Sequence, residues 1–439
     1  MNDNWKGCLV FCLTVLLGMF FCGTSQAKFV NGTVYDQSNW KDIEEYLIPS
    51  FQKFIQDGKL IINNTTKPDF EFKIGQKYHE ASLKNKGKFD VDKDGILIEI
   101  STGKAPGYYF GFPFPEIDAK DPKVAEKIMA NNVAIRYRQT AIYDTGSMTW
   151  VSGRSGVERK VIFGIDSFFF PQRLSGPIDN PRGYLQLDML TFYEPFDLRG
   201  TITMTQMYLD NSPDSSFAYV PMLRRVRRVA AASNRSDPIV GSDMCIDDQW
   251  CWAGKNASMN WTFIGERQIL GAITSSKKEF TKLCPDGTLD RLDRKVNFGF
   301  EVNGFKGAPW CPVDCVWIPR DVWVVEGKAK DPYYLYGKQT MYVDKNTFTI
   351  WMKDVADKSG KYWKTYWQHY DYVETEDGPN SVSLTGGVAD SSVMYDVNSD
   401  HASLSQSSPY PGRPYKFNLT MDMLNPDYFT ETNMRQLSK

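Results

Sequence analysis

The amino-acid sequence predicts a mainly β protein. Aromatic residues make up 14% of the chain, with 12 Trp, 23 Tyr and 27 Phe, and they tend to fall in segments where apolar and polar residues alternate. Aromatic side chains favour strands, and alternation places one side of a strand in a core. Residues 333–372 add a third observation, because two turn signals there separate three strand-like runs in the pattern of an antiparallel meander.

Two helices are expected near the N-terminus. Apolar residues recur at helical spacing over residues 38–57. Pro49 should kink or split this helix, because proline has no backbone N–H to donate. The second helix should begin at Asp121, a good N-cap, with Pro122 in its first turn, and run toward Asn131.

The remaining elements are expected to be strands, because their apolar residues recur with a period of two. Strands are predicted at residues 96–100, 133–143, 184–192 and 201–209, and the meander opens with a strand at 338–343. Residues 399–412, rich in serine and proline, are interpreted as a loop before a final strand at 416–420. An outer-membrane barrel shows the same alternation, but the early helices and long connections disfavour it.

The last strand of the meander carries large rings on both faces. Strand geometry puts Tyr362, Lys364, Tyr366, Gln368, Tyr370 and Tyr372 on one face and Trp363, Thr365, Trp367, His369 and Asp371 on the other. Two interpretations stay open. One face lines a ligand surface while the other packs on a core, or the rings form cross-strand pairs that only stabilise the sheet. Trp363, Tyr366 and Trp367 are therefore candidate ligand-binding residues.

Residues 1–27 predict a cleaved secretory signal. Lys6 precedes a mostly apolar run that ends at Cys22, and residues 25–27 (Ser-Gln-Ala) offer the small side chains that signal peptidase selects. The run is shorter than the roughly 20 apolar residues that a membrane span needs, which disfavours an anchor. The bulky Phe21 before Cys22 disfavours a lipoprotein signal.

Five of the eight cysteines lie beyond the predicted signal. In an oxidising compartment, the close spacing of Cys245 with Cys251 and of Cys311 with Cys315 is most simply interpreted as two disulfide staples. Cys284 makes the count odd, so at least one thiol stays unpaired or pairs outside the chain. Zinc binding or redox chemistry is the alternative, although no Cys-x-x-Cys motif occurs.

The sequence contains no catalytic motif that we recognise. G-x-S-x-G, a P-loop and G-x-G-x-x-G are all missing, and His79, His369 and His401 are widely separated. We therefore expect a protein that is not an enzyme and that has no catalytic residues, no cofactor and no metal. The net charge of -2 and the secretory signal argue against a nucleic-acid partner.

Residues 90–95 match the first half of a calcium-binding EF-hand loop. They read Asp-Val-Asp-Lys-Asp-Gly, with three carboxylates and a turning glycine. The second half fails, because Ser101 stands where a bidentate glutamate is needed and a strand-like run follows. An Asp/Gly hairpin turn is the favoured interpretation, and calcium binding stays open.

Residues 219–228 hold an arginine run, a dense local positive charge in a nearly neutral chain. Each guanidinium requires a carboxylate or phosphate partner. One interpretation is a structural ladder of ion pairs with Asp247 and Asp248, about one hairpin downstream. The other is a binding site for an anionic ligand group. The four arginines are Arg224, Arg225, Arg227 and Arg228.

Several motifs, in the same order, carry a resemblance to a known family. They are Gly111-Phe112-Pro113-Phe114-Pro115, Asp197-Leu198-Arg199-Gly200, residues 219–228, Asp247-Asp248 with Gly254-Lys255, Val322-Trp323-Val324-Val325-Glu326-Gly327 and Tyr342-Val343-Asp344. From about residue 111 to 429 the chain resembles the proteobacterial family catalogued as domain of unknown function 1329. Residues 28–110 resemble it only loosely.

The resemblance implies a fold similar to the LolA/LolB lipoprotein carriers. That fold is a large, strongly curved antiparallel sheet, an unclosed half barrel, with a few helices covering an apolar concave face. Residues 111–439 would form this domain, and residues 28–110 would be an N-terminal helical and strand region joined to it as one unit. The resemblance also implies a periplasmic location and, because family members are often associated with resistance-nodulation-division export systems, such a system as a partner.

Our leading hypothesis is a monomeric periplasmic carrier or binding protein. Its half barrel would hold a lipid or another hydrophobic ligand, with the arginines available to an anionic head group. One alternative is a non-catalytic scaffold, or an outer-membrane-associated partner of an export complex. Another is a glycan-binding protein that uses Trp and Tyr side chains as platforms.

Overall fold

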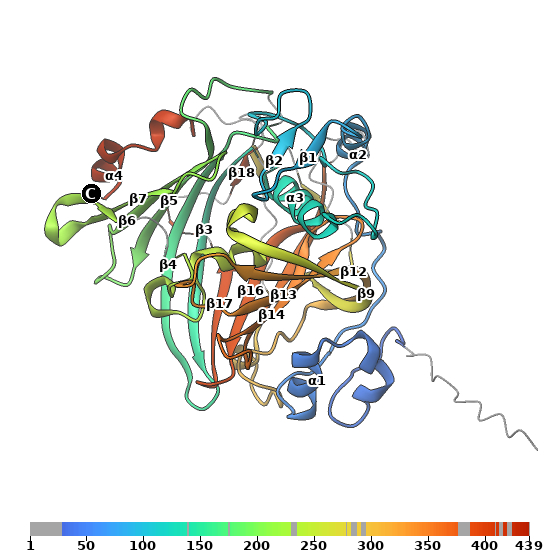
Figure 1. Ribbon diagram of the computed structural model, residues 1–439. Coiled ribbons are helices and arrows are strands. Elements are labelled where there is room, and N and C mark those ends of the chain that lie inside the picture. The colour runs from blue at the N-terminus through green and yellow to red at the C-terminus, as the bar shows by residue number, and fades with distance from the viewer. Residues whose placement is uncertain are drawn as a thin grey trace, which may run out of the picture.

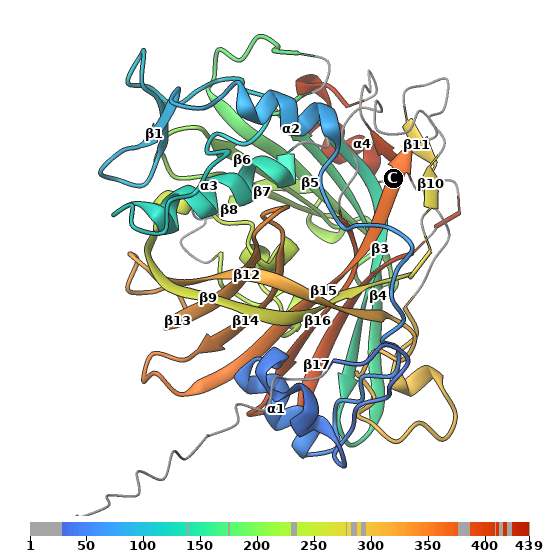
Figure 2. The same ribbon diagram turned by 90° about the vertical axis from the view of Figure 1, so that its right-hand side faces the viewer.

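The architecture is one large, strongly curved sheet with short helices packed on both of its faces (Figures 1 and 2). This computed structural model describes residues 29–137, 140–173, 176–229, 235–277, 279–281, 288–290, 296–375, 387–408, 410–411, 416–418 and 424–438. The predicted signal peptide and Cys284 lie outside these residues. Within these ranges, no helix is both long enough and apolar enough to cross a membrane.

Thirteen of the described strands form a continuous path of hydrogen-bonded neighbours. In spatial order they are β14 (Ile350–Ala356), β13 (Lys338–Asp344), β12 (Val316–Ala329), β9 (Met259–Ile273), β15 (Tyr362–Thr375), β16 (Gly387–Asp396), β17 (His401–Ser407), β3 (Ala141–Ser152), β4 (Gly156–Phe169), β5 (Tyr184–Glu194), β6 (Ile202–Tyr208), β7 (Ser215–Val220) and β8 (Arg225–Val229). Three short strands attach at its sides: β10 (Glu279–Thr281), β11 (Thr288–Asp290) and β18 (Lys416–Asn418).

One end of the sheet folds back on itself and the other stays open. Strand β15 pairs antiparallel with both β14 and β16, and near its end it meets β9 in parallel. At the opposite end, β8 is the outermost described strand. The sheet therefore does not close into a barrel, and the prediction of a mainly β fold with a large, curved, unclosed antiparallel sheet is confirmed.

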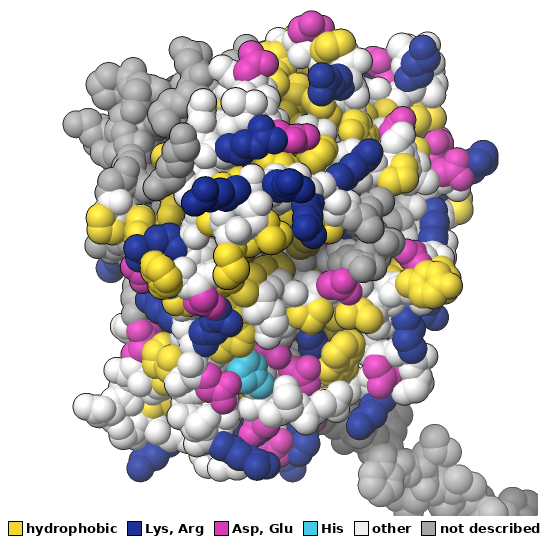
Figure 3. Space-filling view, turned by 90° about the vertical axis from the view of Figure 1, so that its left-hand side faces the viewer, with side chains coloured by type: hydrophobic (Ala, Val, Ile, Leu, Met, Phe, Trp, Pro, Cys, Tyr) yellow, Lys and Arg dark blue, Asp and Glu magenta, His cyan; other side chains and the backbone are white. Residues whose placement is uncertain are grey.

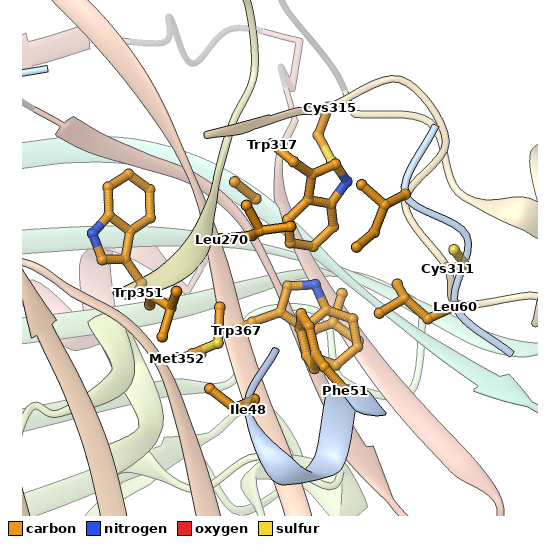
Figure 4. Packing of buried hydrophobic residues seen from close by; sticks show 14 of the residues in the cluster. Ile48, Phe51, Leu60, Leu270, Cys311, Cys315, Trp317, Trp351, Met352 and Trp367 are labelled. Atoms are coloured by element: carbon orange, nitrogen blue, oxygen red, sulfur yellow. The ribbon is translucent and has the colours of Figure 1, made fainter. Parts of the chain in front are cut away.

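The helix predicted over residues 38–57 is split at the proline. The structure has a 3-10 helix η1 (Trp40–Tyr46) and then α1 (Pro49–Gln56), whose first residue is Pro49. Phe51 of α1 lies against the ring of Trp367, with the two ring centroids 5.4 Å apart (Figure 4). The ring centroid of Phe54 lies 6.4 Å from that of Trp367. Together they form a hydrophobic core on one face of β15–β17.

The second predicted helix exists but extends further than expected. It is α3 (Val124–Tyr137), so the strand predicted at residues 133–143 is wrong over its first half, and β3 begins only at Ala141. The reason is tertiary packing: Ala134 and Ile135 are buried in a second core with Trp252, which extends the helix. Helices therefore pack on both faces of the sheet, α1 on one and α3 on the other.

The predicted meander and hairpin turn are both confirmed. Strands β13, β14 and β15 pair in sequence order. Strands β1 (Phe89–Val91) and β2 (Leu97–Glu99) form an antiparallel hairpin, whose turn is held because Asp92 accepts the N–H groups of Asp94 and Ile96. Among the described residues, no cluster of potential metal ligands occurs.

The interpretation of residues 399–412 as a loop is wrong over its first half. Residues 401–407 form strand β17, which pairs with β16 and β3 in the middle of the sheet. Its serines, at every second position, alternate with the buried Ala402 and Leu404. The serine content concealed this alternation, because serine is more typical of turns.

The other described helices are short. They are α2 (Gln76–Leu83), α4 (Glu431–Leu437) and the 3-10 turns η2 (Pro221–Leu223), η4 (Ile239–Gly241), η5 (Ile246–Cys251), η6 (Asn256–Ser258), η7 (Gly299–Glu301) and η9 (Pro426–Tyr428). The turns η4 and η5 belong to a segment that lies across the hollow of the sheet (Figure 1).

Candidate functional site

The candidate site is a cavity in the hollow of the sheet, which we call the main cavity. Its volume is about 1060 Å³ including its opening to solvent. Strands β3, β4, β5, β15, β16 and β17 form its walls, and residues 239–251, the covering segment, close it from the other side.

The two walls of the main cavity differ in chemistry. The wall from β3, β4 and β5 is mostly apolar, and the wall from β15, β16 and β17 carries hydroxyl, amide and carboxyl groups. No lysine or arginine occurs among the described residues that line it. The apolar wall includes Ile142, Met148, Trp150, Val161, Phe163, Ile165, Leu190 and Phe192, and the polar wall includes Gln368, Asp390, Ser391, Ser392, Ser405 and Ser407.

The covering segment contributes apolar side chains and is tied to the sheet by hydrogen bonds. Val240, Met244 and Trp250 face the main cavity. The indole N–H of Trp150 donates to the carbonyl of Gly241 at 3.1 Å. The two short 3-10 turns of this segment supply few backbone hydrogen bonds, so bonds to the sheet help to hold its position.

Asp243 connects the covering segment to two strands of the sheet. Its carboxylate accepts from the Ser403 hydroxyl at 2.8 Å and lies 2.6 Å from Nδ1 of His401. Its carbonyl accepts from the Lys364 ammonium at 2.7 Å. Strands β15 and β17 therefore hold the middle of the segment over the main cavity.

Two buried ion pairs anchor the rest of the covering segment and the residues before it. The Asp247 carboxylate lies 2.5 Å from Nε of Arg235, whose Nη1 also reaches Asp214 at 3.1 Å. The Asp248 carboxylate lies 2.6 Å from the Lys353 ammonium of β14, and both side chains are fully buried. Burial alone would raise the pKa of Asp248, but the neighbouring ammonium lowers it below its ordinary value.

Burial holds three titratable groups around the main cavity in their neutral forms. Burial raises the pKa of Cys245 and of Tyr366 well above their ordinary values. Burial lowers the pKa of His369 to about 3, so its ring is a weak base that positions the Ser391 hydroxyl, 3.0 Å from Nδ1. These environments favour binding of an uncharged group rather than proton transfer near neutral pH.

A second cavity has a volume of about 670 Å³ including its opening to solvent. One small apolar cluster contributes residues to both cavities. Ile142 and Trp250 of this cluster line the main cavity, whereas Val133 and Leu185 line the second. Phe169 is buried between them. Trp250 has a left-handed backbone conformation, with φ at 50°, which residues other than glycine adopt rarely.

The three aromatic candidates from the last meander strand lie in three different places. Tyr366 lines the main cavity. Trp367 points to the opposite face, where it is fully buried against Phe51 and Trp310. Trp363 lines neither cavity, and its indole N–H donates to Asp396 at 2.7 Å.

The four arginines of the run do not line either cavity. Arg224 follows η2, and Arg225, Arg227 and Arg228 lie on the outer strand β8, all of them exposed. The predicted ladder with Asp247 and Asp248 is wrong. Both carboxylates do form ion pairs, but with Arg235 and Lys353, because they are buried under β14 while β8 lies at the rim of the sheet.

The predicted disulfide staples are not formed. Cys245, Cys251, Cys311 and Cys315 are all buried free thiols. The Cys245 sulfur caps the first turn of η5 by accepting from the backbone N–H of Asp248. The Cys311 sulfur lies 3.5 Å from the backbone nitrogen of Ile61. These contacts direct both sulfurs to backbone groups.

Comparisons with known proteins identify the family. A family model described as "Protein of unknown function (DUF1329)" matches residues 34–435, almost the whole of the described chain. The chain belongs to the DUF1329 family. No curated protein matches it.

Solved structures similar to this DUF1329 protein include three bacterial proteins. A putative outer membrane lipoprotein-sorting protein domain from Vibrio parahaemolyticus is 16% identical, with 71% of this chain and 99% of that chain covered and a TM-score of 0.45. A DUF1329 family protein from Desulfovibrio piger is 14% identical, with 71% and 98% covered and a TM-score of 0.45. A LolA superfamily protein from Nitrosomonas europaea is 12% identical, with 70% and 98% covered and a TM-score of 0.41.

The sequence interpretation of this DUF1329 protein missed the polar wall and the covering segment. The signal for the polar wall was present, since Ser403 and Ser405 alternate with the apolar Ala402 and Leu404 as a half-buried strand requires. The covering segment carries no periodic pattern. Its role depends on Arg235 and Lys353, which lie in different parts of the sequence and which no motif connects.

The contact between His401 and Asp243 predicts a pH dependence of stability in this DUF1329 protein. The hydrogen bond to Asp243 raises the pKa of His401 above its ordinary 6.5, and Glu158, 3.5 Å from Nε2, acts in the same direction. Because the folded-state pKa is raised, the stabilisation is complete below pH 6.5 and is lost as the pH rises through the folded-state value.

We expect the difference in unfolding free energy between wild type and His401→Gln to shrink from pH 5.5 to pH 8.5. Urea unfolding at each pH measures it, and the difference cancels the contributions of titrating groups that both variants share. His79→Gln, on α2, is the control and should give no such trend. A difference that stays constant over this range would contradict the prediction.

Proposed function

We propose that this protein is a non-enzymatic periplasmic carrier or binding protein for a lipid or another hydrophobic ligand. The ligand occupies the main cavity. The observation that carries the proposal is the contrast between the walls of this cavity: an apolar wall from β3–β5 faces hydroxyl and amide groups on β15–β17. An amphiphilic molecule fits this arrangement with its apolar part against Phe163 and Phe192 and its polar end toward Ser405 and Gln368.

Burial of apolar surface supplies the binding energy in this proposal. Each buried methylene contributes roughly 0.8 kcal/mol, so a chain of several methylenes is enough for tight binding. Hydroxyl and amide groups on the polar wall set the orientation, because they satisfy a polar end that would otherwise lose its hydrogen bonds to water. The export partner that the family resemblance implies remains part of the proposal.

The proposal is tested with a substitution that fills the main cavity. Protein purified without detergent should carry a bound lipid or similar molecule in native mass spectrometry, and should bind an environment-sensitive apolar fluorophore. Ser405→Trp, in which an indole replaces a partly exposed hydroxyl on the polar wall, should remove both signals while the thermal unfolding transition stays cooperative.

The matched control is Ser155→Trp, in the exposed turn between β3 and β4. This variant should retain the ligand and the fluorophore signal. If wild-type protein carries no apolar molecule and binds no fluorophore, the proposal is wrong. If Ser405→Trp and Ser155→Trp bind equally well, the ligand lies elsewhere.

A further inference from the structure

The two most exposed large apolar side chains of the described chain lie in neighbouring turns. Met222 is 89% exposed and Phe196 is 85% exposed. Phe196 lies between β5 and β6, and Met222 lies in η2, between β7 and β8. These four strands are successive antiparallel neighbours, so both turns are at the same end of the sheet. Gly200 of the first turn packs against Pro221 of the second.

The arginine run adjoins these exposed side chains. Arg224 is the residue after η2, and Arg225 and Arg227 follow on one face of β8. Arg228, on the other face, donates to the Ser215 hydroxyl at 3.1 Å. No carboxylate in the described part of the chain pairs with any of the four. Figure 3 looks onto this side of the molecule, where Lys and Arg side chains gather with hydrophobic side chains between them.

Two acidic groups near this end form ion pairs with other cations. The Asp197 carboxylate, next to Phe196, lies 3.1 Å from Arg159. The Glu431 carboxylate of α4, which packs against β7 and β8, lies 3.6 Å from Arg435. The arginine run therefore keeps an uncompensated positive charge that reaches solvent beside the apolar turns.

Charged side chains on an edge strand have one structural role, which is to prevent pairing with another sheet. That role explains arginines on β8. It does not explain Phe196 and Met222, which lie in turns and gain nothing from exposure to water. Apolar side chains that project beside a basic cluster are instead typical of surfaces that bind anionic membranes, because the rings enter the lipid while the cations meet phosphates.

We propose that this end of the sheet, the docking tip, binds the surface of an anionic lipid bilayer. Phe196, Met222 and Leu223 enter the bilayer interface, and Arg224, Arg225 and Arg227 bind the lipid phosphates. The bidentate guanidinium fork suits phosphate oxygens. The docking tip is separate from the residues that line the main cavity, so this inference does not require the cavity to hold a ligand.

Co-sedimentation of the purified protein with vesicles tests the docking tip. One set of vesicles contains phosphatidylglycerol and phosphatidylcholine, and the other contains phosphatidylcholine alone. Wild-type protein should sediment with the anionic vesicles only, and the binding should fall as salt is raised, because ions screen the phosphates. Arg225→Gln with Arg227→Gln should weaken binding about 30-fold. Met222→Ser with Phe196→Ser should weaken it about tenfold or more.

The control for charge is Lys93→Gln with Lys328→Gln, two exposed lysines outside the docking tip, which should leave vesicle binding unchanged. Thermal unfolding checks that each variant is folded. If wild-type protein does not sediment with anionic vesicles, or if both docking-tip variants bind as wild type does, the inference is wrong. If wild-type protein does not bind vesicles and the arginine variant self-associates, the arginines serve to protect the sheet edge from pairing. The inference is then also wrong.

Discussion

Lys353→Met should destabilise the protein by about 3–5 kcal/mol, because it leaves the Asp248 carboxylate buried without its counter-ion. The Lys353 ammonium lies 2.6 Å from Asp248 and 2.8 Å from the Gln339 side-chain oxygen, and neither member of the ion pair is exposed. Methionine has a similar volume and makes no ion pair. The measured quantity is the free energy of unfolding in urea near pH 7.

A second variant separates the charge from the packing. In Lys353→Met with Asp248→Asn, the amide oxygen can still accept from the Cys245 N–H and the Tyr336 hydroxyl, which lie 2.7 and 2.8 Å from the carboxylate in the wild type. No uncompensated charge remains, so we expect the double variant to recover most of the lost stability.

The single variant should also recover at acid pH. Without Lys353, burial raises the pKa of Asp248 instead of the ammonium lowering it, so protonation on acidification removes the buried charge. Lys86→Met breaks an exposed ion pair with Glu116 and should cost less than about 1 kcal/mol. If Lys353→Met is no more destabilising than Lys86→Met, the buried pair does not anchor the covering segment.

Trp250→Ala should change the length of apolar chain that the protein prefers. Trp250 belongs to the apolar cluster that contributes to both cavities. It comes from the covering segment, whereas the other members of this cluster come from the sheet or from α3. In the wild type, affinity should rise with the length of a saturated acyl chain and then level off when the chain fills the main cavity. In Trp250→Ala the chain can continue toward the second cavity, and affinity should keep rising by about fourfold per methylene.

Displacement of a bound fluorophore by a series of monoacylglycerols, which carry acyl chains without a charged group, measures this profile. Trp363→Ala removes a tryptophan that lines neither cavity and should leave the profile unchanged. If wild type binds no acyl chain, the proposed function fails. If wild type binds but both variants show the wild-type profile, the proposed function stands and Trp250 does not limit chain length.

Local patterns predicted local structure well. Alternation marked β5, β6 and β13, proline split the first helix at Pro49, and Asp92 with its glycine gave the hairpin turn, because each depends on neighbours in sequence. The same local reasoning failed at residues 133–137. Residues 133–137 have only weak helix propensity, and their apolar residues alternate as in a strand. They form the end of a helix because they pack in one core with Trp252.

The partners of charged residues could not be predicted. Asp247 and Asp248 were recognised as ion-pair residues, but proximity in sequence pointed to the arginine run. In the structure, Lys353 comes from strand β14, which lies far downstream of Asp248 in the sequence. A buried carboxylate requires a cation wherever the fold can supply one, and the sequence order does not say where that is.

The sequence by itself determined that this chain is mainly β and that its last meander strand has rings on both faces. It also contained the arginine run at residues 219–228, one of the motifs that carry the family resemblance. Only the tertiary structure decided which ring faces a cavity. Tyr366 and Trp367 are adjacent and equally aromatic, yet the first lines the main cavity and the second is buried under α1. Alternation fixes which side chains share a face, whereas the curvature of the sheet and the segments packed on it fix what each face meets.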